Sequence, residues 1–149
     1  MRLLTLLLFT GIGLFGCGVR APMTQFTSST ITNTTSEAIE MDVEFEISNT
    51  NDLPIRLMMY NYAVTADGRT VFIGKSDAQL TIPRWSTTRS SIPVVIRKDA
   101  ITDPESVTWK LSGSLGYVPP SAFAEALRTS GLWETSTRVN AQGVFSIPN

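Results

Sequence analysis

Carboxylate and amide side chains gather between residues 40 and 52, and they are the groups in this chain that are best suited to chemistry. Four carboxylates stand at alternate positions, and two amides and a further carboxylate follow: Glu40, Asp42, Glu44, Glu46, Asn49, Asn51 and Asp52. Paired carboxylates serve acid–base catalysis, and oxygen ligands of this kind bind Ca²⁺. The element that positions them decides whether they form a site.

That element is a strand. Between Ala38 and Ser48 five apolar residues alternate with the four carboxylates, which is the pattern of a half-buried antiparallel β-strand. Side chains at positions i and i+2 of a strand lie roughly 6.5–7 Å apart, so these carboxylates are poorly placed to share a proton. A straight row also fails to converge on one cation. We interpret the carboxylates as a solvated face that opposes edge-to-edge aggregation.

The amides that follow form a turn in our interpretation, and not a metal loop. The stretch Asn49-Thr50-Asn51-Asp52 lacks the spacing of a calcium-binding loop. Asn and Asp favour turns because they hydrogen-bond nearby backbone and tolerate left-handed conformations. Pro54 then restricts Leu53 to extended geometry. The sequence therefore predicts a corner between two strands.

Composition excludes several classes of function. The chain has no histidine and a single cysteine, so catalytic triads with histidine and histidine-based metal sites are excluded. Lys75, Lys98 and Lys110 occupy polar or strand-exterior positions, which argues against a Ser-Lys mechanism. The net charge of −1 and the scattered basic residues argue against nucleic acid as a partner. We expect no enzymatic activity, no metal and no cofactor.

The three tryptophans are the remaining binding candidates. Trp109 and Trp133 are in phase with apolar strand neighbours, so we expect them to pack in the core. Trp85 stands between Arg84 and Ser86 in a predicted turn. It is the tryptophan whose exposure bears on binding.

The first residues have the pattern of a signal peptide, with Arg2 ahead of an apolar run that reaches Phe15. The run ends in Leu14-Phe15-Gly16-Cys17, which resembles the lipobox of bacterial lipoproteins. That resemblance implies cleavage before Cys17, diacylglycerol on its sulfur and, in most such proteins, an acylated amine. We therefore divide the chain into a signal peptide (1–16), a lipidated tether (17–22) and one domain (23–149).

Short strands at roughly ten-residue spacing predict the fold of that domain. The Asp67-Gly68 pair predicts a hairpin turn, Pro93 an edge or a bulge, and Gly113 a close contact on its strand. Imperfect alternation at Met58 and Met59 predicts a bulge or a strand buried on both faces, and Gly143 a possible bulge or turn in the last strand. The expected fold is all-β: a fibronectin-III/immunoglobulin-like sandwich of about seven antiparallel strands, with one short helix near 121–129.

The order of these features resembles the late embryogenesis abundant (LEA) type 2 domain, also called the water stress and hypersensitive response domain. Its turn residues here are Asn49, Asn51, Pro54, Gly68 and Pro83. The strand motifs that resemble the family are Leu80-Thr81-Ile82-Pro83 and Lys110-Leu111-Ser112-Gly113-Ser114-Leu115. The chain departs from the family at Thr50, where proline is more usual, and in the stretch 121–131.

The resemblance implies a seven-stranded sandwich without established catalytic residues and an association with desiccation and other stress. We expect a lipoprotein held on a membrane through Cys17, with a non-catalytic protective or interaction domain, a possible protein client or envelope partner, and a monomeric state. In some bacteria an aspartate directly after the lipidated cysteine retains a lipoprotein in the inner membrane. Position 18 is glycine here, so we prefer the periplasmic side of the outer membrane. The alternative is an envelope protein that binds a hydrophobic small ligand or a protein partner.

Overall fold

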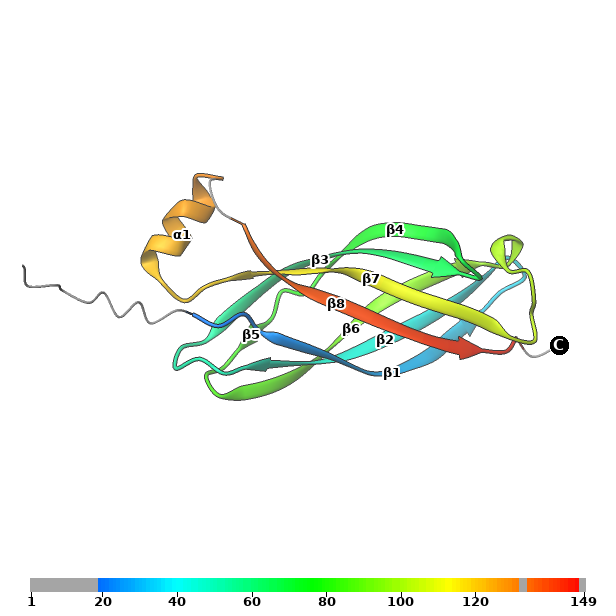
Figure 1. The fold of residues 1–149 in the computed structure, drawn as a ribbon, viewed down its shortest axis with the longest axis horizontal. Helices are drawn as coiled ribbons and strands as arrows, with labels where there is room; N and C mark the ends of the chain where they lie inside the picture. The colour runs from blue at the N-terminus through cyan, green and yellow to red at the C-terminus, as the bar shows by residue number, and fades with distance from the viewer. Residues whose placement is uncertain (1–18, 132–133, 148–149) are drawn as a thin grey trace, which may run out of the picture.

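The computed structural model describes residues 19–131 and 134–147 and forms two antiparallel sheets packed face to face (Figure 1). One sheet has the order β1-β2-β6, from β1 (Met23–Thr34), β2 (Ala38–Asn49) and β6 (Ser86–Arg97). The other has the order β4-β3-β7-β8, from β3 (Ile55–Ala66), β4 (Arg69–Asp77), β7 (Val107–Val118) and β8 (Thr135–Phe145), and the two-residue β5 (Thr81–Ile82) pairs with β3. This confirms the predicted all-β sandwich.

Two short helices complete the fold. The 3-10 helix η1 (Lys98–Ala100) follows β6, and α1 (Ala122–Thr129) lies between β7 and β8, where the sequence predicts a short helix. Among the described residues, no helix combines the length and the apolar character that crossing a membrane requires.

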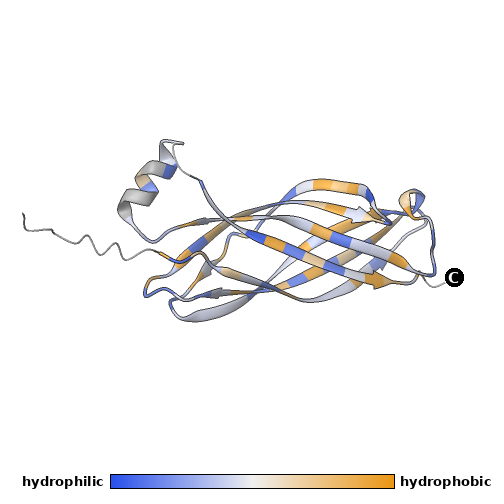
Figure 2. Ribbon diagram, viewed as in Figure 1, coloured by the Kyte–Doolittle hydropathy of each residue, from blue (hydrophilic) through white to orange (hydrophobic). Residues whose placement is uncertain are grey.

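The core lies between the sheets and follows from the period of two. In β2 the apolar residues Met41, Val43, Phe45 and Ile47 are buried, while their neighbours face outward. Figure 2 shows the same alternation of apolar and polar residues along the strands. Trp109 is buried as predicted and its ring meets Phe26 edge-on. Trp133 lies outside the described residues.

Local irregularities match their sequence signals. Asp67 and Gly68 both have positive φ (47° and 78°), as a two-residue hairpin of type I′ requires. The pairing of β3 with β7 shifts between Leu57 and Tyr60, which confirms a bulge at Met58 and Met59. Pro93 lies on β6, an edge strand of its sheet, where a missing N–H is tolerated.

Two glycines allow close packing across strands. A Cβ atom at Gly113 would lie 2.3 Å from the backbone oxygen of Asn61, which confirms the close contact expected there. At Gly143 a Cβ atom would lie 2.9 Å from Nε1 of Trp109. The bulge or turn that we considered at Gly143 is absent, because β8 pairs with β7 in continuous register from Thr135 to Phe145. This glycine makes room for the indole ring.

The strands run lengthwise, so the molecule has two distinct ends (Figure 1). The segment 19–22 enters β1 at one end, beside the loops 50–54 and 83–85 and on the side of α1. We call this the tether end. The opposite end carries the hairpin at Asp67 and Gly68, η1 and the end of β8. β1 therefore starts at the tether end, and β8 finishes at the opposite one.

Candidate functional site

Asn49 organises the corner at the tether end. Its side chain is 1% exposed, and its Nδ2 donates to the backbone oxygens of Leu53 (2.9 Å), Pro83 (3.0 Å) and Ile82 (3.2 Å). A buried amide is costly unless it is hydrogen-bonded, and this one joins the end of β2 to the 50–54 loop and to the start of the β5–β6 connection. The predicted turn residue is thus a structural hub, with every contact made inside the domain.

Asn51 ties the same corner to the N-terminal segment. Its Nδ2 donates to the backbone oxygen of Arg20 at 2.9 Å, and the backbone N–H of Arg20 donates to its Oδ1 at 2.8 Å. The side-chain amide thereby pairs with Arg20 as a neighbouring backbone would. This contact fixes where the chain enters the sandwich, three residues before β1 begins at Met23.

Trp85 is attached to the third residue of the corner. Its indole Nε1–H donates to Oδ1 of Asp52 at 3.0 Å, while the side chain stays 64% exposed. Trp85 has φ of 51°, a left-handed conformation that a bulky residue rarely adopts. Trp85 is therefore exposed, which the sequence could not decide, and the hydrogen bond from its N–H to Asp52 holds the ring in place.

Other apolar side chains at the tether end are exposed as well. Val19 is 40%, Met23 60% and Leu53 52% exposed. The basic residues Arg20 and Arg84 adjoin them and are exposed too. We define the tether-end surface as these six residues: Val19, Arg20, Met23, Leu53, Arg84 and Trp85. Of these residues the sequence indicates Trp85 alone, because Val19, Arg20, Met23 and Leu53 come from segments that only the fold brings beside it.

The carboxylates on the outer face of β2 do not converge on one point. Glu44 accepts a hydrogen bond from the Ser28 hydroxyl at 2.9 Å, and Glu46 forms an ion pair with Arg89 at 3.4 Å. These two carboxylates thus interact with different neighbours, Glu44 with β1 and Glu46 with β6. Within residues 19–131 and 134–147, no group of three or more acidic or cysteine side chains is arranged to hold a metal ion.

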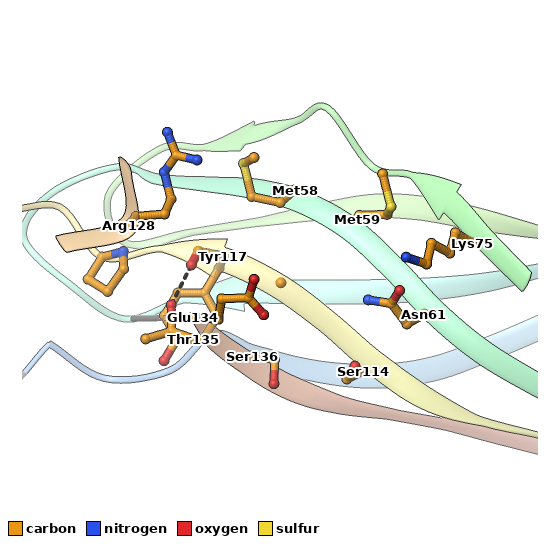
Figure 3. Close-up of a pocket in the computed structure, with 12 residues that line it drawn as sticks. Met58, Met59, Asn61, Lys75, Ser114, Tyr117, Arg128, Glu134, Thr135 and Ser136 are labelled. Atoms are coloured by element: carbon orange, nitrogen blue, oxygen red, sulfur yellow. Dashed lines mark hydrogen bonds between the residues drawn. The ribbon is translucent and has the colours of Figure 1, made fainter. Parts of the chain in front are cut away.

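A pocket of about 360 Å³ opens on the outer face of the larger sheet, beside α1. Its lining includes Met58 and Met59 of the β3 bulge, Lys75 of β4, Ser114 of β7 and Arg128 of α1 (Figure 3). The bulge turns two methionines to this face, and the cations stand to either side of them (Figure 3). The sequence predicts the bulge from neighbouring residues. It does not predict the pocket, because the pocket forms only where β3, β4, β7 and α1 come together.

A cluster of charges holds α1 beside this pocket. Glu125 pairs with Arg128 one turn later on the helix at 2.9 Å and with Arg56 of β3 at 3.1 Å. The hydrogen bond from Arg128 is the main reason why the pKa of the Glu125 carboxyl is lowered, and Arg56 lowers it further. The carboxylate therefore stays ionised and bridges the helix to the sheet.

The residues named from the sequence fall in separate places. Asn49, Asn51, Pro54 and Pro83 lie together at the tether end, and Pro83 contributes its backbone oxygen to the Asn49 hub. Gly68 lies in the hairpin at the opposite end. Cys17, the predicted lipidation site, lies outside the described residues.

No family model and no curated protein sequence matches the chain. Several solved structures match the fold of the chain. The solution structure of AT1g01470 from Arabidopsis thaliana is 14% identical over 89% of this chain and 85% of that one, with a TM-score of 0.67. A candidate late embryogenesis abundant protein, At2g46140.1, is 17% identical over 87% of this chain and 73% of that one, with a TM-score of 0.66.

A crystal structure of a protein from Archaeoglobus fulgidus is 11% identical over 89% of this chain and 99% of that one, with a TM-score of 0.53. At such identities the similarity concerns the fold. This chain therefore has an LEA-like β-sandwich fold.

Proposed function

We propose that this chain is a lipoprotein of the cell envelope, anchored through Cys17, and that its LEA-like domain acts without catalysis as a stress-related protective or interaction module. The lipobox-like sequence Leu14-Phe15-Gly16-Cys17 is the source of the anchor. The periplasmic side of the outer membrane is the preferred location, because Gly18 follows the cysteine.

One observation carries the proposal, namely the double hydrogen bond between Asn51 and the backbone of Arg20. It fixes the N-terminal segment at one end of the sandwich, three residues after Cys17. An acyl anchor on Cys17 would thus hold the domain by a defined end. A non-catalytic role is favoured by the use of the polar groups of Asn49 and Asn51 in structural hydrogen bonds.

The anchor is tested by the full-length variant Cys17→Ser in a bacterial host. We expect the wild type in the membrane fraction, resistant to high salt, with the mass of a diacylglyceryl modification at Cys17. The Cys17→Ser variant should lose both properties, and Gly18→Ala, which keeps the cysteine, should lose neither. Unchanged membrane retention of Cys17→Ser would contradict the anchor.

The protective role needs a separate test. The wild-type protein in reconstituted vesicles should reduce aggregation of a heat-sensitive enzyme on heating or drying, compared with vesicles that carry an inert lipoprotein at the same protein mass. An effect no larger than that of the inert lipoprotein would contradict protection and leave the anchor untouched.

A second candidate function is supported by the outer pocket. Its volume lies within the range of small-molecule sites, and Met58 and Met59 offer flexible apolar contacts beside the cations Lys75 and Arg128. Glu134 also lines the pocket and Arg128 is paired with Glu125, so Lys75 is the group that would receive the anionic end of a hydrophobic ligand. The test is a fluorescent fatty acid titrated into wild type and Ser114→Phe, which fills the pocket from β7. Binding that is absent, or equal in both proteins, would contradict this alternative.

A further inference from the structure

The tether-end surface combines four exposed apolar side chains and two arginines at the end of the domain nearest to Cys17. We propose that this surface rests in the headgroup region of a lipid bilayer, with Trp85 and Leu53 inserted at the interface and Arg20 and Arg84 against anionic headgroups. The inference rests on the proposed anchor and adds a second, non-covalent contact that orients the domain.

Hydrogen bonds hold the surface together, so it is a preformed patch. Asn51 fixes Arg20, and hence Val19, to the 50–54 loop. Asp52 fixes the indole of Trp85 to the same loop, next to Leu53. Three segments distant in sequence thereby present their apolar side chains at one end of the sandwich.

The length of the tether selects the bilayer as the partner. Val19 follows Cys17 by two residues, and an extended chain spans at most about 7 Å over that distance. Acyl chains on Cys17 lie in the hydrocarbon, so Val19 and the loops beside it cannot stand far from the headgroups. Contact with the bilayer then removes the exposed apolar side chains of this surface from water.

Trp85 has the properties of an interfacial anchor. Tryptophan is enriched at membrane–water interfaces because its ring is apolar and its N–H stays hydrated or hydrogen-bonded. Here Asp52 satisfies the N–H and leaves the ring exposed. The left-handed φ of 51° would suit glycine better. The strained position of an exposed tryptophan favours a role in a contact outside the domain.

The charges at the two ends support the same orientation. The loops that form the tether-end surface carry Arg20 and Arg84 against Asp52, while α1 and the residues around it, on the same side, carry Arg56 and Arg128 against Asp77, Glu125 and Glu134. The opposite end holds five carboxylates, Glu37, Asp67, Asp99, Asp103 and Glu105, against three cations: Lys98, Arg69 and Arg97, the last of which is paired with Asp99. An anionic bilayer attracts the arginines of the tether-end surface and repels the opposite end, where carboxylates outnumber cations, and salt weakens both effects.

The experiment uses the lipidated full-length protein in phosphatidylcholine vesicles, with and without phosphatidylglycerol, and compares ordinary lipids with lipids brominated near the headgroup. Bromine quenches tryptophan fluorescence on contact. The chain has three tryptophans, so the signal is the difference in quenching between the wild type and a variant that lacks Trp85. Flotation of the same vesicles reports the acyl anchor independently.

We expect the wild type to float and to be quenched by brominated lipid, more strongly with phosphatidylglycerol and less at high salt. Trp85→Gly should float but lose this quenching, with its unfolding midpoint unchanged or raised, because glycine relieves the strained φ. Ile73→Ser, which removes an exposed apolar side chain from β4, should keep the quenching.

Leu53→Ser is a second test variant, which retains Trp85 but removes an apolar side chain of the proposed contact. Brominated lipid should quench its tryptophan fluorescence less than that of the wild type. A protein that floats without quenching, or with equal quenching in Trp85→Gly, would overturn the interfacial contact and leave the anchor intact. A wild-type protein that fails to float would overturn the anchor itself, and the contact with it.

Discussion

Oδ1 of Asn49 accepts two hydrogen bonds from Asn51, one from its backbone N–H and one from its side-chain amide, both at 2.9 Å. The first stabilises the turn after β2, and the second orients the amide that pairs with Arg20. The two asparagines act in series, so the burial of one determines the position of the other. A change at Asn49 therefore affects both the core and the N-terminal segment.

Asn49→Ala should destabilise the domain by about 2–4 kcal/mol, because it removes a buried amide that donates to the backbone oxygens of Leu53, Ile82 and Pro83, of which Ile82 is itself buried. Urea unfolding followed by circular dichroism measures the change. Asn33→Ala removes the same side chain from an exposed position on β1 and should leave the midpoint within error. A loss below about 1 kcal/mol for Asn49→Ala would contradict the role of the hub.

The two core tyrosines should respond in opposite ways to loss of their hydroxyls. The Tyr62 hydroxyl donates to the backbone oxygen of Pro93 at 2.7 Å and joins the two sheets, so Tyr62→Phe should cost about 1 kcal/mol. The buried hydroxyl of Tyr60 has no hydrogen bond of good geometry within the described part of the chain, although Ser90 is near. Tyr60→Phe should be neutral or stabilising.

Burial raises the pKa of both phenols, with the Ser90 hydroxyl opposing this at Tyr60, so neither ionises near neutral pH. The test compares the thermal unfolding midpoints of Tyr60→Phe, Tyr62→Phe and the wild type at pH 7. Equal destabilisation of both would contradict the difference between the two hydroxyls.

Gly113→Ala should be strongly destabilising and Gly116→Ala should be tolerated, although both glycines lie on β7. A Cβ atom at Gly113 would overlap the backbone of Asn61 and Tyr62, which cannot move without breaking the β3–β7 pairing. At Gly116 the nearest atom, Cβ of Met58, would lie at an ordinary contact distance of 3.5 Å. We expect a cost of about 3 kcal/mol or more at Gly113. Similar midpoints for the two variants in urea would contradict the close approach.

Asp67 should make stability depend on acid pH. Backbone N–H groups of Thr102 (3.0 Å) and Thr108 (3.1 Å) donate to its carboxylate, and these hydrogen bonds lower the pKa of Asp67 against an opposing effect of burial. A carboxyl whose pKa is lower in the folded state stabilises the fold above its unfolded pKa of about 3.9, and this contribution is lost as the pH falls through the folded pKa.

Asp67→Asn tests this directly, because asparagine tolerates the left-handed φ of 47° at this position. The variant should unfold at a lower temperature than the wild type at pH 7, and the two midpoints should approach each other towards about pH 2. The control is Glu105→Gln, which changes an exposed carboxyl in the adjacent loop and should leave the midpoint at pH 7 unchanged. A gap between the wild type and Asp67→Asn that stays constant with pH would contradict the assignment.

Features that depend on local sequence were predictable. The alternation in β2, the Asp67-Gly68 hairpin and the bulge at Met58 and Met59 each depend on neighbouring residues and on backbone sterics. Gly113 was predictable because it stands in phase with apolar residues, which marks a missing side chain on a packed face.

Features that join distant segments were not predictable from one sequence. Asn49 and its sequence neighbours are typical of an ordinary turn, and none of them indicates that the Asn49 amide donates to Ile82 and Pro83. The pairing of Arg56 with Glu125 depends on where α1 packs. Gly143 was misread as a bulge or turn because its partner, Trp109, lies on the adjacent strand.

The directions of β1 and β8 determine how the domain would bear mechanical load. A pull at the tether end draws β1 along its axis against β2, and a pull at the opposite end draws β8 along its axis against β7. In this shear geometry the hydrogen bonds of a whole strand pair resist together, whereas unzipping would break them one at a time. Force between the tether end of β1 and the far end of β8 therefore loads these strand pairs in shear, and rupture would require long antiparallel ladders to fail at once.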